Sequence, residues 1–126
     1  MEVEQLLDSD RFARVLGARL VEATPDRLVV ELEPADHHLD AGGRISAGVL
    51  FSLADCAMSL ISNTGRTAVA VAAQFTPTAP IVPGGPIRAE ARRGLPPNGR
   101  ADTWLVTLMA EGGAVGSFTG TTLRVD

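Results

Sequence analysis

The chain has 126 residues, 45% of them hydrophobic, which suits one domain with one apolar core and is unlike a disordered chain. Its net charge of −4 argues against a basic face for nucleic acid, and the absence of lysine excludes a Schiff-base enzyme. A single cysteine, an acidic N-terminus and the lack of a membrane-spanning apolar run predict a cytoplasmic domain of residues 1–126 with no membrane partner.

The first predicted element is a short amphipathic helix over residues 1–16, interrupted near Ser9 and stopped by Gly17. Period-two alternation over residues 18–33, with a turn at Pro25, predicts a β-hairpin. One face of its second strand carries Leu28, Val30 and Leu32, and the other carries Arg27, Val29, Glu31 and Glu33. This hairpin would therefore pack on a core through one face.

A loop rich in Asp, His and Gly follows over residues 34–44, and such loops often carry functional groups. Residues 46–63 then form the longest proline-free segment that can be helical, and apolar side chains occupy most of its circumference. A helix of that kind is normally buried on more than one side. Its polar positions fall on one narrow stripe made of Ser52, Asp55, Ser59 and Ser62.

The second half of the chain predicts four strands separated by Gly- and Pro-rich turns. They cover residues 67–76, 87–93, 102–110 and 115–125, with turn signals at 80–86, 95–100 and 112–113. The order of elements predicts an α+β fold in which a mostly antiparallel sheet surrounds one long central helix.

Asp55 is the most informative polar residue, because a carboxylate in an apolar helix must be paired, hydrated or protonated. Its own helix offers no cation at the positions one turn away. It could be a structural acid bonded to serine or backbone groups, or a general base or nucleophile in a cleft. The helical pattern alone is compatible with both roles.

The glycine-rich segment 42–48 leads into that helix, so backbone N–H groups there could face a developing negative charge. The same residues could simply form a turn with Ser46 as helix cap. Ala47 and Asp55 are separated by about 12 Å along one helix. A site that uses both groups would therefore have to be built across a dimer.

The segment from His38 to Asp55 resembles the signature of hotdog-fold thioesterases of the phenylacetate-degradation (PaaI-like) branch, H-x-N-x-x-G-x-x-H-G-G-x-x-x-x-L-x-D. The alignment needs no gap and continues through residues 74–80 and 85–91 into the last two strands. The resemblance therefore covers nearly the whole chain from about Ala18, and it implies a hotdog fold.

The resemblance also implies hydrolysis of an acyl-coenzyme A thioester at a site shared by two subunits, without a metal or another cofactor. Asp55 would activate water or attack the carbonyl, and the N–H of Ala47, with that of Gly48, would bind the carbonyl oxygen. A hydroxyl that holds water would come from Ser59 or Thr67. The protein would be a homodimer, or a dimer of dimers.

The chain departs from the signature at three positions. Ser46 replaces a histidine, Ala47 replaces a glycine, and Asp40 replaces an asparagine. Asp40 accepts hydrogen bonds where an amide would also donate them, and Ser46 cannot take up a proton near neutrality. We expect Asp40, Ser46 and His38 to line the substrate site, with His38 also organising the loop.

Two further clusters have alternative interpretations. His37 and His38 with the neighbouring aspartates lack ordinary zinc spacing, so we expect no metal site. Four arginines lie within thirteen positions and could form a solvated strand face or bind coenzyme A phosphates, with Arg100 as the first candidate. These four are Arg88, Arg92, Arg93 and Arg100. Cys56 lies off the polar stripe and is predicted to be a packing residue.

The predicted function is acyl-coenzyme A hydrolysis. The alternative is a non-catalytic module that keeps the acyl-coenzyme A cleft but has lost turnover, as the altered Ser46-Ala47 segment would suggest. A hydratase or dehydratase would need a histidine beside its acid, and both histidines precede the helix. The sequence leaves medium-chain and small aryl acyl groups equally open.

Overall fold

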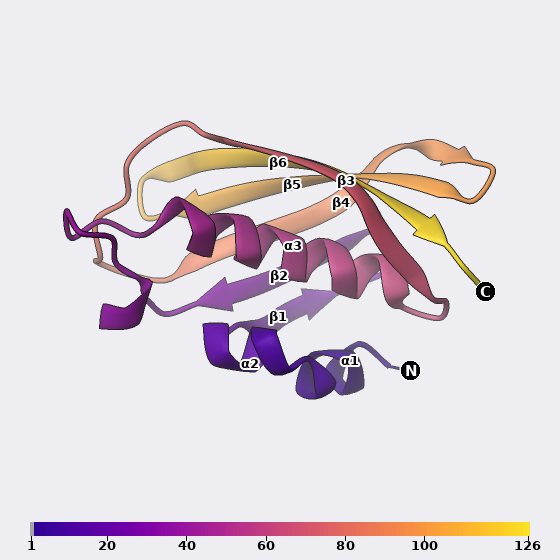
Figure 1. Cartoon of the computed structure of the whole chain (residues 1–126), viewed down its shortest axis with the longest axis horizontal. Coiled ribbons are helices and arrows are strands. Elements are labelled where there is room, and N and C mark those ends of the chain that lie inside the picture. Colours follow the sequence, from indigo (N-terminus) through magenta and orange to yellow (C-terminus); the bar gives the residue numbers. More distant parts are fainter. Residues whose placement is uncertain (1) are drawn as a thin grey trace.

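The computed structural model describes residues 2–126, so Met1, which the predicted helix 1–16 included, lies outside the described residues. One antiparallel sheet of six strands curves around the long helix α3 (Figure 1). In chain order the elements are α1 (Val3–Ser9), α2 (Arg11–Leu16), β1 (Arg19–Ala23), β2 (Arg27–Leu32), the 3-10 helix η1 (Asp36–His38), α3 (Ala47–Asn63), β3 (Ala68–Pro77), β4 (Ile87–Asn98), β5 (Ala101–Ala110) and β6 (Gly113–Arg124). The predicted α+β class and hotdog fold are confirmed.

The N-terminal segment breaks into two helices at Asp10, which has extended backbone angles. Its side chain accepts the N–H of Ala13 at 3.0 Å and so caps α2. Gly17 ends α2 with a φ of 90°, a left-handed conformation that favours glycine. Ala13 and Leu16 are the buried residues of α2, so this short helix packs on the core through one side.

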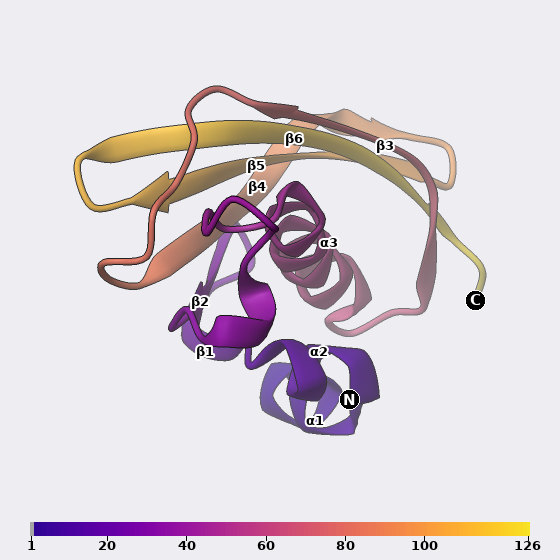
Figure 2. The same cartoon turned by 60° about the vertical axis from the view of Figure 1, so that its left-hand side comes forward.

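The strand order β1-β2-β4-β5-β6-β3 makes β1 and β3 the two edges of the sheet. Figure 2, which looks nearly along α3, shows the sheet curving around this helix while α1 and α2 lie below it. One cluster of buried side chains joins α3 to the inner face of the sheet. Among residues 2–126, no helix has both the length and the apolar character needed to cross a membrane.

Helix α3 approaches β6 closely at Gly120, where the strand has no side chain. A Cβ atom placed there would lie 2.2 Å from the Sδ of Met58 and 3.0 Å from a ring carbon of Phe118. Met58 and Phe118 are both 1% exposed, so neither can move into solvent. The absence of a side chain at Gly120 is therefore what lets the helix lie against this strand.

We expect Gly120→Ala to lower the free energy of unfolding by about 1–3 kcal/mol, the usual cost of overpacking a core. Chemical denaturation of both proteins measures the difference. Gly84→Ala is the matched control, because no heavy atom lies within 4 Å of a Cβ built there. Equal loss of stability in the two variants would contradict the close packing at Gly120.

The second face of β2 is less exposed than its sequence predicts. Val29 is 4% exposed and Glu31 is 8% exposed, although both alternate with the core residues of this strand. The Glu31 carboxylate is bonded by Arg19 and by the Nε of Arg88, the latter at 2.7 Å. Long arginine side chains can bury such an acid on a sheet face that is otherwise polar.

The hydrogen bond from Arg19 lowers the pKa of Glu31 below its ordinary value; burial opposes this change, and Arg88 reinforces it. A folded-state pKa below the unfolded one contributes stability above the ordinary pKa of glutamate. This contribution disappears as the pH falls through the lowered folded-state value. The ion pair is therefore intact at neutral pH and is lost only in acid.

Strand β4 is longer than predicted and continues to Asn98, where the sequence predicts a turn over residues 95–100. Its pairing with β5 is irregular between Arg93 and Leu95 and again between Leu95 and Asn98. The two prolines at positions 96 and 97 fall inside the second irregularity, so their missing N–H groups remove no regular ladder bond. The turn is reduced to Gly99-Arg100.

Candidate functional site

The polar stripe predicted on α3 is the side of the helix that the fold leaves partly open. Ser52, Asp55 and Ser59 are half-buried, whereas Ser62 is 1% exposed and belongs to the interior. The remaining residues between Leu53 and Ile61 are buried. Asp55 therefore lies in the middle of the accessible line between Leu53 and Ile61, and α3 is also exposed nearer its N-terminus at Ala47, Gly48 and Phe51.

The N-terminus of α3 leaves one amide available. Ser46 caps the helix: its hydroxyl accepts the N–H of Gly48 at 3.2 Å, and its own N–H donates to the His38 carbonyl at 2.9 Å. Within residues 2–126, the N–H of Ala47 has no hydrogen-bond acceptor. Ala47 is also exposed. Of the two N–H groups predicted to bind the oxyanion, that of Gly48 already donates to the Ser46 hydroxyl. The N–H of Ala47 is therefore the remaining candidate.

Asp40 shapes the loop that leads to this amide. Its Oδ1 accepts the N–H groups of Gly42 at 2.8 Å and Arg44 at 3.0 Å, and its own N–H donates to the Arg44 carbonyl at 2.7 Å. A hollow of about 410 Å³ opens between this loop, the start of α3 and the segment after β3. It is lined by Asp40, Arg44, Ile45, Ala47, Leu50 and residues 77–81.

His38 has a structural role in this loop. It is 3% exposed, its Nδ1 accepts the Ala35 N–H at 2.9 Å, and its Nε2 lies 2.7 Å from the Leu16 carbonyl. Because the carbonyl needs a donor, the ring is the Nε2–H tautomer. Both nitrogens are used within the chain, so the expected substrate contact of His38 has no free ring atom. The expected loop-organising contact is present.

Asp55 has a perturbed acid–base environment. Burial raises the pKa of its carboxyl above the ordinary value, and the negative charge of Asp10 raises it further. No ion pair or hydrogen bond to this carboxylate occurs within residues 2–126. A carboxylate with a raised pKa and no ion-pair partner can accept a proton from water.

Phe51 is an exposed residue of α3 that lies one turn after Ala47 and one turn before Asp55. Its ring lies edge-on to Phe118 of β6 with centroids 5.3 Å apart, and to Phe75 of β3 with centroids 6.5 Å apart. This aromatic contact places the open side of α3 next to the edge strand β3. Ala47 and Asp55 remain about 12 Å apart along the helix axis, so one chain does not bring them together.

The other predicted site residues are divided between two places. Ser59 lies on the open stripe, one turn after Asp55. Thr67 and Arg100 lie at the opposite end of the molecule from Ala47, where α3 ends and β4 turns into β5. Thr67 donates its N–H to Asp126, which lines the same hollow as Arg100. These two residues are therefore remote from the hollow beside Ala47.

The four clustered arginines do not form one patch. Arg88 and Arg92 lie on the outer face of the sheet, where they pair with Glu31 and Glu90, respectively. Arg93 instead donates to Asp102 at 2.6 Å. Neighbouring residues of a strand point to opposite faces, which separates Arg92 from Arg93.

Sequence reasoning missed Asp102, which is 1% exposed and lies close to Arg66, Arg93 and Arg124. A signal was available in the period-two pattern of its strand. Asp102 shares the inward positions of β5 with Trp104, Val106 and Leu108, all of them buried. A charged residue in such a series indicates a buried ion pair.

Cys56 is a packing residue, as predicted. It is 6% exposed, and burial raises the pKa of its thiol to about 12, with smaller effects from Asp10 and Asp55. The thiolate needed for nucleophilic attack is therefore scarce at neutral pH. Within residues 2–126, no three His, Cys, Asp or Glu side chains are grouped closely enough to hold a metal ion.

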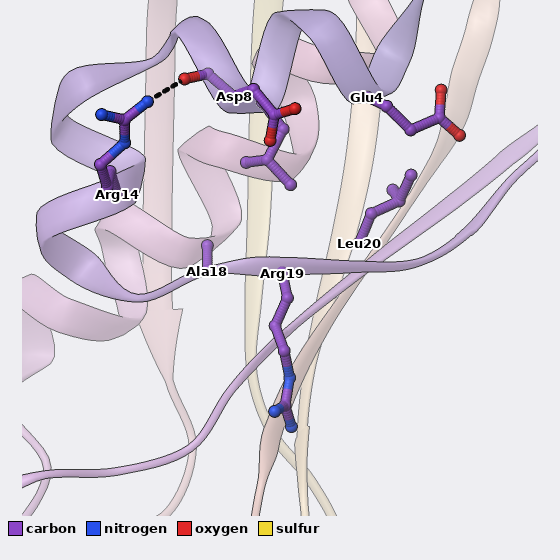
Figure 3. A pocket seen from close by; sticks show the side chains of 7 residues that line it. Glu4, Asp8, Arg14, Ala18, Arg19 and Leu20 are labelled. Carbon is purple, nitrogen blue, oxygen red and sulfur yellow. Dashed lines mark hydrogen bonds between the residues drawn. The ribbon is translucent and has the colours of Figure 1, made fainter.

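A further hollow lies between α1, α2 and β1, shown in Figure 3. Glu4 and Asp8 come from α1, and Arg14 donates from α2 to the Asp8 carbonyl. Arg19, on β1, is paired with Glu31. None of the residues predicted to act in catalysis lines this hollow, so it is not the candidate site.

Known proteins are similar to this chain in sequence and in fold. No family model matches it. A putative esterase of Archaeoglobus fulgidus is 31% identical over 90 residues; the match spans 71% of this chain but only 58% of that relative. A mutant of the phenylacetic acid degradation protein PaaI of Thermus thermophilus is 34% identical, with a TM-score of 0.87 over 92% of this chain and 100% of that one.

The PaaI protein of Escherichia coli shares the fold, with a TM-score of 0.92 at 23% identity over 99% of this chain and 91% of that one. The chain spans about half the length of the curated relatives that it matches, both of which are named putative esterases. The motif residues of the loop and of α3 occur in the same fold as the two PaaI proteins. The chain belongs to the PaaI-like branch of the hotdog-fold family.

Proposed function

We propose that the protein hydrolyses acyl-coenzyme A thioesters at sites shared by two subunits. The observation that carries this proposal is the free N–H of Ala47 in the hollow at the start of α3, on the same open side of the helix as the half-buried Asp55. One group is suited to bind an oxyanion and the other to take up a proton. The family resemblance supplies the substrate class.

The exposed edge of β3 supports a dimer that would complete the site. Among the described residues 2–126, β3 pairs only with β6, and Val69 and Val71 on it are 47% and 57% exposed. An unpaired, largely apolar edge strand is a template for pairing with another chain. Antiparallel pairing of two β3 strands would place the open sides of two α3 helices side by side in opposite directions. Asp55 of one subunit could then approach Ala47 of the other.

A dimer of dimers is the larger assembly that we propose. The outer face of the sheet carries large apolar side chains among threonines on β5 and β6. Leu105, Met109 and Leu123 are 37%, 41% and 37% exposed there. Apolar patches on a sheet face favour burial against a second copy.

The proposed reaction places the thioester carbonyl beside Ala47, whose N–H would stabilise negative charge on the carbonyl oxygen. Asp55 of the other subunit would accept a proton from water as the water oxygen bonds to the carbonyl carbon. The carbon–sulfur bond then breaks, and the departing thiolate takes up the proton. In the alternative route the Asp55 carboxylate attacks the carbonyl carbon, and the carbon–sulfur bond breaks to give a mixed anhydride and the thiolate. Water then hydrolyses the anhydride to the free acid and the Asp55 carboxylate, and the proton released goes to the thiolate. Both routes need Asp55 to be ionised.

Thiol release from short, medium, long and aryl acyl-coenzyme A thioesters tests the proposed activity. Release by the wild type supports hydrolysis and gives the acyl preference. Calorimetric binding of acyl-coenzyme A without release would instead favour a non-catalytic binding module. The absence of both thiol release and binding of acyl-coenzyme A would contradict both the hydrolase and the binding module.

Mixed oligomers test the shared site. The Ala47→Pro and Asp55→Asn variants are each expected to lose most of the activity, but co-assembly should create sites in which both groups are intact. We expect activity to return on mixing after reversible dissociation. A site contained within one chain would give no recovery, because every chain would carry one defect. Mixing wild type with each variant controls for losses during dissociation.

A further inference from the structure

A second hollow lies at the end of the molecule opposite to Ala47. It has a volume of about 340 Å³ and is formed where α3 leads into β3, β4 turns into β5 and β6 ends. Its lining residues are Gly65, Arg66, Gly99, Arg100, Arg124 and Asp126. Three arginines and one aspartate therefore line this hollow in a protein whose net charge is −4.

A buried acid positions two of these arginines. Asp102 is 1% exposed, and its Oδ1 accepts from Arg93 at 2.6 Å. Its Oδ2 has no hydrogen-bond partner within residues 2–126, although the Nε of Arg124 lies at 3.3 Å and the Nη1 of Arg66 at 4.0 Å. The guanidinium of Arg93 stacks over the Trp104 ring at 4.7 Å. Arg93 thus neutralises the charge of the Asp102 carboxylate. The guanidinium groups of Arg66 and Arg124 retain N–H donors for another acceptor.

The three lining arginines differ in how firmly they are held. Arg124 donates to the Gly99 carbonyl, which fixes its guanidinium across the β4–β5 turn. Arg66 has only the long contact to Asp102, and its side chain is 32% exposed. The Arg100 side chain makes no hydrogen bond or ion pair with any other residue in 2–126. The hollow therefore combines one fixed guanidinium with two that are free to bind an anion.

We propose that this hollow binds a phosphate group of the coenzyme A carrier, through Arg66, Arg100 and Arg124 held around Asp102. Guanidinium groups match phosphate oxygens through paired hydrogen bonds, which favours a phosphate over a monodentate anion. The inference rests on the proposed function for the identity of the ligand. The observed arrangement of charges supplies the phosphate chemistry independently.

The position of the hollow fits such a ligand. In an acyl-coenzyme A, the pantetheine arm separates the thioester from the diphosphate and from the ribose phosphate. The phosphates must therefore bind away from the reacting carbonyl. The open stripe of α3 runs from Asp55 through Ser59 to Asn63, about 12 Å along the axis, and the loop that carries Arg66 follows directly.

Equilibrium binding to the intact protein tests this inference without requiring turnover. The probes are coenzyme A, dephospho-coenzyme A, phosphopantetheine and pyrophosphate. The variants are Arg100→Gln and Arg66→Gln, and Arg92→Gln is the matched control because it removes the same charge from the outer sheet face. Thermal melting should be unchanged for Arg100→Gln, since its side chain holds no other residue.

We expect Arg100→Gln and Arg66→Gln each to weaken coenzyme A binding by about tenfold or more, and Arg92→Gln to leave it unchanged. If the ribose phosphate is bound, wild type prefers coenzyme A over dephospho-coenzyme A, and the variants lose this preference. If the diphosphate is bound, the variants lose affinity for both ligands and for pyrophosphate. Either pattern supports the inference.

Equal coenzyme A affinities in wild type and all three variants would overturn the inference, as would a wild type that binds neither coenzyme A nor pyrophosphate. The result is separate from catalysis. A wild type that releases no thiol but loses coenzyme A affinity on Arg100→Gln would contradict the proposed hydrolysis and keep the phosphate site. If the wild type releases thiol and the arginine variants bind coenzyme A as tightly as the wild type, the proposed hydrolysis is supported and the phosphate site is contradicted.

Discussion

Asp55→Asn is expected to lower thiol release by at least about a hundredfold, the scale of general-base catalysis. The amide has nearly the same shape as the carboxylate but cannot accept a proton or attack the carbonyl. Asp55 makes no ion pair within residues 2–126, so its replacement breaks no contact that holds the fold. Steady-state kinetics with the preferred thioester measure the loss, and light scattering checks the assembly.

Ser52→Ala is the matched control, because Ser52 lies one turn away on the same open stripe and donates only to the Gly48 carbonyl. It should retain most of the activity. Unchanged turnover in Asp55→Asn would reject the proposed mechanism. Equal loss in both variants would indicate that the stripe has only a general packing role.

The raised pKa of Asp55 has two further consequences for this variant. Activity of the wild type should fall in acid as the pH drops through that pKa, which lies above the ordinary aspartate value because of burial. Ionised Asp55 also costs stability, since the unfolded chain releases this proton more readily. Wild type should therefore lose stability relative to Asp55→Asn as the pH rises through this range. The two proteins should be equally stable in strong acid.

Ala47→Pro is expected to lower kcat by about 10²–10³, the usual effect of removing one oxyanion donor. Proline deletes the N–H that has no partner within residues 2–126 and leaves the carbonyl in place. Ala47 is the first residue of α3, a position where proline is well tolerated. The preceding Ser46 has a φ of −61° and a ψ of 138°, which suits a residue before proline.

Ala47→Gly is the control, because it keeps the N–H and restores the residue of the family signature. It should keep kcat near the wild-type value. Circular dichroism should show the helix content unchanged in Ala47→Pro. Full activity in a folded Ala47→Pro variant would remove the oxyanion role from this amide.

The sequence predicted the order of elements because their signals are local. Apolar periodicity over residues 46–63 gave the central helix, and Ser46 before it gave the cap. The prediction was less accurate at β4, where Pro96 and Pro97 indicate a turn but fall inside an irregular stretch of strand. Proline lacks a backbone N–H, and an irregular stretch of strand accommodates this lack as well as a turn does. Proline alone therefore does not distinguish the two.

The candidate site was predictable only in part. The motif from His38 to Asp55 predicted the loop and the acid, and the separation of Ala47 and Asp55 along the helix led to the prediction of a site shared by two subunits. The motif could not distinguish the free N–H of Ala47 from that of Gly48, since the distinction depends on where the Ser46 hydroxyl points. It also could not show that both nitrogens of His38 are occupied.

By itself, the sequence determined the helix, the strands, the acidic and lysine-free surface and the residue types available for chemistry. Only the tertiary structure decided which of these residues meet. Arg66, Asp102 and Arg124 lie on a loop and two strands and converge at one end of the sheet. Arg92 and Arg93 are adjacent in sequence but lie on opposite faces. The reason is physical: periodicity records the neighbours along one element, whereas these contacts depend on how strands distant in sequence pair.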